Sequence, residues 1–122
     1  MILIQKELSE QIIGAAMRVH NELKPGLDEK IYEKALVVEL TSQGINVQQQ
    51  SRFQVHYKNT LVGTLVPDLI VDEKIIVDTK IATVFHDTHI AQMIGYLAIT
   101  ELHLGLLINF KNAKLEWKRV AR

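Results

Sequence analysis

The sequence contains no cysteine among its 122 residues. Disulfide bonds and thiolate metal sites are therefore excluded. No apolar run reaches the ~18 residues that a membrane-spanning helix needs. The N-terminus also lacks the charged and apolar pattern of a secretory signal peptide. From these absences we expect a cytoplasmic protein that does not enter the membrane.

An excess of charge of one sign is also missing, because 14 basic residues balance 14 acidic ones. No overall basic field therefore points to nucleic acid. The distribution is uneven, since residues 111–122 contain five basic residues and one acidic residue. Such a basic segment could contact phosphates or could be an ordinary solvated C-terminus, and the composition leaves both interpretations open.

The length predicts one domain, residues 1–122, large enough to bury a core. Apolar residues recur at helical spacing after Ser9, which predicts a helix from Ser9 to about Leu23 with Ser9 as its N-cap. Pro25-Gly26 ends this stretch. A second helix is expected to start after a capping Asp28, and Gly44 suits the position that follows its C-terminus.

The pattern then changes to the period of two that is typical of strands. We expect strands at Val47–Tyr57, at Thr60–Val66 with a bulge at Gly63 and a continuation over Leu69–Val71, at Lys74–Ile81, at Leu106–Phe110 and at Lys114–Val120. Lys58-Asn59 reads as a hairpin turn. A further helix is expected over Asp87–Glu101. The fold class is therefore α/β, a mixed sheet flanked by helices in the order ααβββαββ.

One predicted hairpin of this sheet carries three charged residues on the same face. If the turn is centred on Glu73, Asp68 lies directly opposite Asp78, and both carboxylates share one face. Lys80 is two residues beyond Asp78 and shares that face too. A register slip of one residue would separate them.

Two carboxylates on one face can hold a hard divalent cation such as Mg²⁺, which prefers oxygen ligands. The cation would polarise a phosphoryl oxygen and lower the pKa of a bound water, and a neighbouring lysine would stabilise developing negative charge. An ordinary ion pair between Asp78 and Lys80 at a strand end explains the same spacing. The pattern alone therefore leaves two interpretations open, a metal site and a simple ion pair.

The segment also resembles a known signature. Pro67-Asp68 followed by Asp78-Thr79-Lys80 spells PD…DxK, the motif of the PD-(D/E)xK, or restriction-endonuclease-like, nuclease superfamily. Within that superfamily the chain resembles the GxxExxY proteins. Their name-giving motif matches Gly26, Glu29 and Tyr32, and their helix after the lysine strand is similar to the segment that carries His89, Gln92 and Tyr96. That family usually has glutamate where this chain has Asp78.

The resemblance implies a role for each matching residue. Asp68 and Asp78 would be metal ligands, joined by the carbonyl of Thr79 and by Glu29. Lys80 would position the attacking water. Gln92 and Tyr96 would line the catalytic site and contact the substrate or the lysine. The implied cofactor is Mg²⁺ or Mn²⁺.

The implied function is a metal-dependent nuclease that hydrolyses phosphodiester bonds of DNA or RNA through a Mg²⁺-activated water. The small chain offers little surface for holding a duplex, so a homo-oligomer is plausible. The alternative is a catalytically silent module that keeps the nuclease fold and binds or regulates a partner. In a third reading the chain is a structural interaction protein.

Overall fold

Three helices account for much of the chain. The computed structural model describes residues 5–122, and within them the helices are α1 (Lys6–Leu23), α2 (Glu29–Ser42) and α3 (Asp87–Thr100). Asp28 occupies the N-cap position of α2, as expected, although its side chain makes no capping hydrogen bond. None of these helices combines the length and the apolar character needed to cross a bilayer.

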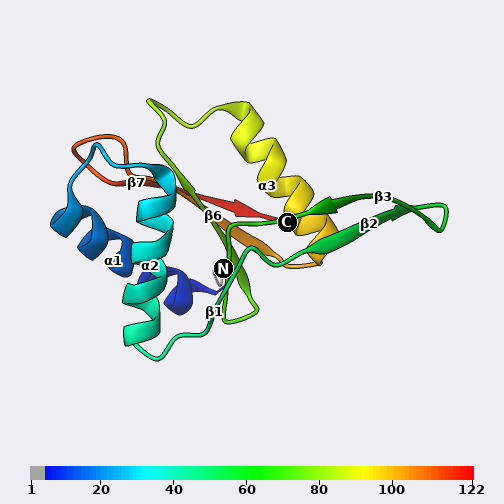
Figure 1. Ribbon diagram of the computed structural model, residues 1–122, viewed down its shortest axis with the longest axis horizontal. Coiled ribbons are helices and arrows are strands. Elements are labelled where there is room, and N and C mark those ends of the chain that lie inside the picture. Colours follow the sequence, from blue (N-terminus) through cyan, green and yellow to red (C-terminus); the bar gives the residue numbers. More distant parts are fainter. Residues whose placement is uncertain (1–4) are drawn as a thin grey trace.

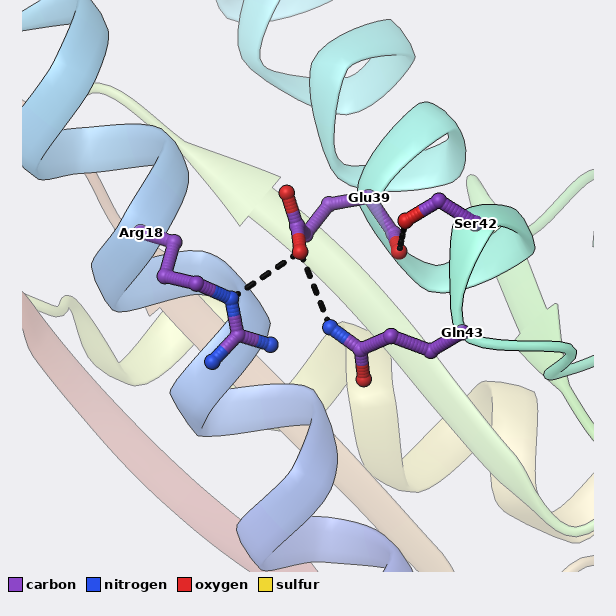
Figure 2. Close-up of polar contacts among 4 residues, drawn as sticks. All are labelled: Arg18, Glu39, Ser42 and Gln43. Carbon is purple, nitrogen blue, oxygen red and sulfur yellow. Dashed lines mark hydrogen bonds and ion pairs between the residues drawn. The ribbon is translucent and has the colours of Figure 1, made fainter.

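Polar side chains link α1 to α2 along their exposed edge (Figure 2). The Arg18 Nε of α1 donates to Glu39 Oε2 of α2 at 2.9 Å, and Gln43 Nε2 donates to the same oxygen at 2.9 Å. These two hydrogen bonds lower the pKa of Glu39. The two helices therefore form one layer.

Within residues 5–122, seven strands form two sheets. Five of them make the main sheet, in the order β1-β4-β5-β6-β7, and the other two make a separate hairpin. Only β5 and β6 run parallel, and the other neighbours in both sheets are antiparallel. The strands are β1 (Val47–Gln49), β2 (Phe53–Tyr57), β3 (Thr60–Leu65), β4 (Leu69–Val71), β5 (Ile75–Lys80), β6 (Leu104–Asn109) and β7 (Glu116–Ala121). The expected α/β class with a mixed, helix-flanked sheet is confirmed.

The central strands are buried on both faces, which explains their continuous apolar sequences. One face packs under α1 and α2 and the other under α3 (Figure 1). In β5, Ile75 and Val77 belong to the first cluster and Ile76 to the second. Alternation along the strand therefore places Asp78 and Lys80 on the α3 side.

The hairpin of β2 and β3 extends away from the body (Figure 1). Lys58 and Asn59 both have positive φ, as in the tight two-residue turns that match the twist of a hairpin. The expected hairpin turn is thus confirmed. The register shifts between Val55 and His56, so that Val62 is the extra residue of a bulge beside the expected Gly63.

Three expectations about element boundaries were wrong. α1 begins at Lys6, three residues before the expected cap, and Ser9 is a buried helical residue whose hydroxyl donates to the Lys6 carbonyl. The strands expected on either side of Lys58-Asn59 are each divided between the two sheets. The strand expected over Thr60–Val66 does not continue over Leu69–Val71, because β3 and β4 belong to different sheets. Likewise, the strand expected over Val47–Tyr57 divides into β1 and β2. The division lies at Gln50, whose φ of 53° ends the extended conformation.

Gly105 lets α3 approach the sheet closely. A Cβ at this position of β6 would overlap the side chain of Met93, which is fully buried. We expect Gly105→Ala to lower the free energy of unfolding by about 1–3 kcal/mol through overpacking. Urea denaturation of both proteins measures this difference.

Gly95→Ala is the matched control. Gly95 lies in α3, and a Cβ there meets no atom within 4 Å. Alanine is the better helix former, so this variant should gain up to about 1 kcal/mol. Equal stability of Gly105→Ala and the wild type would contradict the close packing of Met93 against β6.

Candidate active site

The pairing of β4 with β5 brings two carboxylates together. The register joins Leu69 to Val77, Ile70 to Ile76 and Val71 to Ile75, which centres the turn on Glu73 as the sequence predicts. Asp68 and Asp78 are the next pair along this register, and a hydrogen bond connects their side chains. Asp78 is 3% exposed. Asp68 and Asp78 therefore face each other at the end of the β4–β5 hairpin that lies opposite its turn.

The surroundings of Asp68 favour its protonated form and raise its pKa. Burial raises the pKa of Asp68 from 3.8 to about 7, with further contributions from the hydrogen bond to Asp78 and from the negative charge of Asp78. Lys30 and Lys80 oppose this increase in the pKa. Two neighbouring carboxyl groups avoid ionising together, so Asp68 keeps its proton to a higher pH than an exposed aspartic acid does.

Lys80 completes the trio on the same face. Its Nζ lies 3.1 Å from Asp78 Oδ2, and its side chain is 17% exposed. Burial disfavours the ammonium, but the negative charges of Asp78, Glu29 and Asp68 outweigh burial and raise the pKa of Lys80. Lys80 is therefore a charged hydrogen-bond donor that carboxylates hold at the mouth of the site.

Glu29 approaches the trio from the first turn of α2. The backbone N–H of Ile81, next to Lys80, donates a hydrogen bond to its carboxylate. Burial is the largest effect and raises the pKa of Glu29, Lys80 lowers it, and Asp68 raises it. The N-terminal end of a helix favours a carboxylate at this position. The pKa of Glu29 therefore responds to the charges of both Lys80 and Asp68.

Tyr32 fixes the loop from which Glu29 emerges. Its ring is fully buried and stacks on Phe110 with a centroid distance of 4.6 Å. Its hydroxyl donates to the Lys24 carbonyl at 2.5 Å and accepts from the Leu27 N–H at 3.1 Å. Between these two residues, Gly26 takes a φ of 114° that side chains disfavour. The motif of Gly26, Glu29 and Tyr32 therefore works as a brace for the start of α2.

The residues of α3 that were predicted to line the site differ in how they interact with the two acids and Lys80. Burial, followed by the charges of Asp78 and Asp68, raises the pKa of Tyr96, which places its hydroxyl near the two acids. Burial, followed by the charge of Lys80, lowers the pKa of His89. Gln92 is exposed, and within residues 5–122 its side chain joins the group through no hydrogen bond or ion pair.

A buried glutamate that sequence reasoning did not single out supports Asp68. Glu33 is 2% exposed and pairs with Lys30 at 3.2 Å. Gln50 Nε2 donates to the second Glu33 oxygen at 3.1 Å, and the Gln50 N–H donates to the Asp68 carbonyl at 3.0 Å. The chain between β1 and β2 is thereby tied to both α2 and Asp68. A glutamate one residue after Tyr32 was the only sequence signal.

Asn109 holds the chain beyond Lys80 in place. This fully buried residue is opposite Lys80 in the parallel register. Its side-chain oxygen accepts from the backbone N–H groups of Ala82 and Lys111, and its amide donates to the Ala82 carbonyl at 2.6 Å. The signal that could have revealed it is an asparagine within the apolar run from Leu106 to Phe110, where an unpaired polar group would be costly.

The donor set suits a hard cation. Asp68 and Asp78 offer oxygen ligands, and Mg²⁺ commonly binds through one or two carboxylates while it keeps several waters. A positive ion between them would relieve the repulsion that raises the pKa of Asp68. In the described part of the chain, however, no three His, Asp or Glu side chains lie close enough to form a complete metal cluster. Glu29 and the carbonyl of Thr79 therefore stay predicted ligands.

A cavity of about 360 Å³ lies beside this group. Its walls come from the loop before α2 and from the chain after Lys80, and they consist of Pro25, Gly26, Leu27, Asp28, Ile81 and Lys111. Asp28 and Ile81 are the sequence neighbours of Glu29 and Lys80. The cavity is therefore lined by the residue before Glu29, the residue after Lys80 and a further lysine, Lys111.

The raised pKa of Asp68 makes stability depend on pH in the metal-free protein. The pKa of Asp68 is about 7 when folded and 3.8 in its ordinary state, so the folded state binds the proton more tightly. The contribution to stability is complete below pH 4 and is lost as the pH rises through 7. We expect chemical denaturation to show this loss.

Asp68→Asn is the control for that experiment, because the amide keeps the shape and cannot ionise. The variant should match the wild type near pH 4 and exceed its stability at pH 8. The excess should be on the order of 1–2 kcal/mol, which allows for the partial exposure of Asp68. A difference between the two proteins that does not vary with pH would show that folding does not raise the pKa of Asp68.

Removing the Tyr32 hydroxyl should loosen the brace. Tyr32→Phe leaves the Lys24 carbonyl and the Leu27 N–H without their partner, which should cost about 1–3 kcal/mol of unfolding free energy. Hydrogen exchange at the Leu27 amide should accelerate as well. Tyr57→Phe is the matched control, since Tyr57 is 66% exposed and its change should stay within about 0.5 kcal/mol. Unchanged exchange at Leu27 would contradict the role of the brace.

Comparisons with known proteins bear on the fold and on the family of the chain. The crystal structure of the protein SSO0001 is similar, with a TM-score of 0.62 and 14% sequence identity over 76% of this chain and 49% of that one. The present chain thus spans about half the length of that protein, and the likeness concerns the fold alone. No curated protein matches the sequence significantly. A family model described as the PD-(D/E)XK nuclease superfamily matches residues 6–120. The chain therefore belongs to the PD-(D/E)XK nuclease superfamily.

Proposed function

We propose that this protein is a metal-dependent phosphodiesterase that cleaves nucleic acid at Asp68, Asp78 and Lys80. The observation that carries the proposal is the acid pair itself. A hydrogen bond joins the two carboxyl groups on one face of the sheet, and the Lys80 Nζ lies 3.1 Å from Asp78 Oδ2. Such a pair is costly to bury for stability alone, whereas it is what a cation-assisted hydrolysis needs.

Asp68 and Asp78 would hold Mg²⁺ or Mn²⁺, with Glu29 and the Thr79 carbonyl as the further proposed ligands. When bound, the cation supplies charge that polarises the phosphoryl group and makes a water more acidic. Lys80 stays protonated beside Asp78 and donates a hydrogen bond to the attacking water or to a phosphoryl oxygen. This donor stabilises the negative charge that grows in the transition state.

Tyr96 and Gln92 would complete the wall of the site from α3. Burial and the two acids raise the pKa of Tyr96, so its hydroxyl stays protonated and can donate to a phosphate oxygen. Gln92 is exposed on the same helix, where it could reach a substrate that lies across the site. Lys111 on the rim of the adjacent cavity adds positive charge for the strand that enters.

The chain is also proposed to be a GxxExxY protein. Support comes from the coherent role of the matching residues. Gly26 makes the turn, Tyr32 braces it, and Glu29 is directed toward Lys80 and Asp68. A motif whose three residues act together in this way is more specific than three separate matches.

A cleavage panel tests the proposal. Purified protein with Mg²⁺ or Mn²⁺ should cut at least one of four substrates, single- or double-stranded DNA or RNA. Lys80→Ala should lower the rate by about 100-fold or more, since it removes a donor that acts on developing charge. Asp68→Ala and Asp78→Ala should abolish the metal-dependent rate.

Lys74→Ala is the matched control. Lys74 is an exposed lysine of the β4–β5 hairpin and forms an ion pair with Asp72 at its turn. Its rate should equal that of the wild type, and a contaminating nuclease would be unaffected by every variant. Metal binding measured by calorimetry without cleavage of any substrate would instead favour a silent binding or regulatory module that acts with a partner.

A further inference from the structure

The packing of the main sheet and helices does not explain why the chain forms the β2–β3 hairpin, which we call the arm (residues 53–65). It projects from the body and forms a two-stranded sheet of its own (Figure 1). Isolated two-stranded hairpins gain little stability in water. Three large apolar side chains of the arm are nevertheless exposed, namely Tyr57 at 66%, Leu61 at 52% and Val62 at 60%.

The charge of the arm and its flanks is one-sided. Residues 40–67 contain no aspartate or glutamate, although the chain has 14 acidic residues in all. The same stretch carries Arg52 and Lys58, and His56 lies between them. Lys58 and Asn59 form the tip, and the Lys58 Nζ lies 5.6 Å from the centroid of the Tyr57 ring. The arm therefore offers hydrogen-bond donors and positive charge to an anionic partner.

The base of the arm is fixed to the side of the sheet that carries the acids. Phe53 packs against the cluster of Ile70, Met93 and Leu97 under α3. The other strand ends at Leu65, and only Val66 and the buried Pro67 separate it from Asp68. A ligand that lies along the arm is thus directed toward the carboxylate pair.

We infer that the arm enters the major groove of double-stranded DNA and holds the duplex against the site of the proposed nuclease, on which this role rests. The major groove of B-DNA admits a two-stranded ribbon, whereas the deep and narrow major groove of duplex RNA does not. Strands of five and six residues extend about 17–20 Å, enough to cross the groove. The exposed apolar side chains can contact thymine methyl groups.

The arm is a poor strand for pairing with a second protein chain. The bulge at Val62 interrupts the regular edge of β3, and bulges are among the features that prevent edge-to-edge association. Three apolar residues are also few compared with the 20–30 residues that a stable protein interface uses on each side. The positive and polar surface of the arm suits phosphates and base edges better.

Binding to a DNA duplex of about 20 base pairs, roughly two turns, tests the arm. Lys80→Ala serves as the background, so that the DNA is not cut. Adding Lys58→Glu should weaken duplex binding at least about tenfold, and Lys58→Gln should reduce the salt dependence of binding by about one phosphate contact. Single-stranded DNA and duplex RNA should bind more weakly than duplex DNA.

Lys34→Glu is the matched control, because Lys34 is exposed on α2, which packs on the other face of the sheet. It should change duplex affinity by no more than about twofold. Equal effects of the two charge reversals would overturn the inference. So would a dimer that Leu61→Ser dissociates, if Lys58→Glu left duplex binding unchanged, because the arm would then be a self-association element.

Hydrolysis of bis-nitrophenyl phosphate separates the two proposals, since this phosphodiester is too small to reach the arm. Lys80-dependent hydrolysis that Lys58→Glu leaves unchanged supports both the active site and the distinct role of the arm. If no hydrolysis occurs, the proposed nuclease function fails, while the duplex-binding measurements still decide whether the arm binds DNA.

Discussion

The contact between Asp68 and Asp78 is the constraint around which the rest of the structure is arranged. Two acids that face each other on a buried sheet repel when both ionise, and burial disfavours each charge further. The protein accommodates them with a raised pKa of Asp68, with Lys80 next to Asp78 and with Lys30 on the side of Asp68. A cation between the carboxylates would replace the proton of Asp68, so the same geometry that raises the pKa of Asp68 prepares the site for metal.

Precise placement of these groups depends on contacts outside the trio. The Gln50 N–H holds the Asp68 carbonyl, and Asn109 holds the segment after Lys80. Tyr32 ties down the loop from which Glu29 starts. Each of these contacts fixes the backbone and does not involve the carboxyl groups of the two acids. Such supporting contacts keep catalytic groups within the small tolerances that chemistry requires.

The sequence predicted the β4–β5 hairpin correctly, because the residues that determine its register lie close together in the sequence. A turn centred on Glu73 and an apolar run on each side allow one register, and the observed pairs follow it. Local patterns misplaced the start of α1, where Ser9 forms a hydrogen bond within the helix and also accepts one from Arg119, 110 residues away. They also missed the break at Gln50, which depends on its contacts with Glu33 and Asp68. Long-range partners of this kind leave no periodic trace in a sequence.

A net charge of zero is compatible with binding nucleic acid when the charges are segregated. Screening limits the reach of exposed charges to about 8–10 Å in physiological salt, so a bound strand senses the local surface and not the total. Residues 40–67 have no acidic group, and the carboxyl groups of Asp68 and Asp78 follow them in the sequence. For the proposed nuclease, this order lets a basic and polar arm attract the backbone, while the acids would accept a phosphate only together with a cation. Association with the duplex and competence for cleavage would then depend on different residues of one continuous segment.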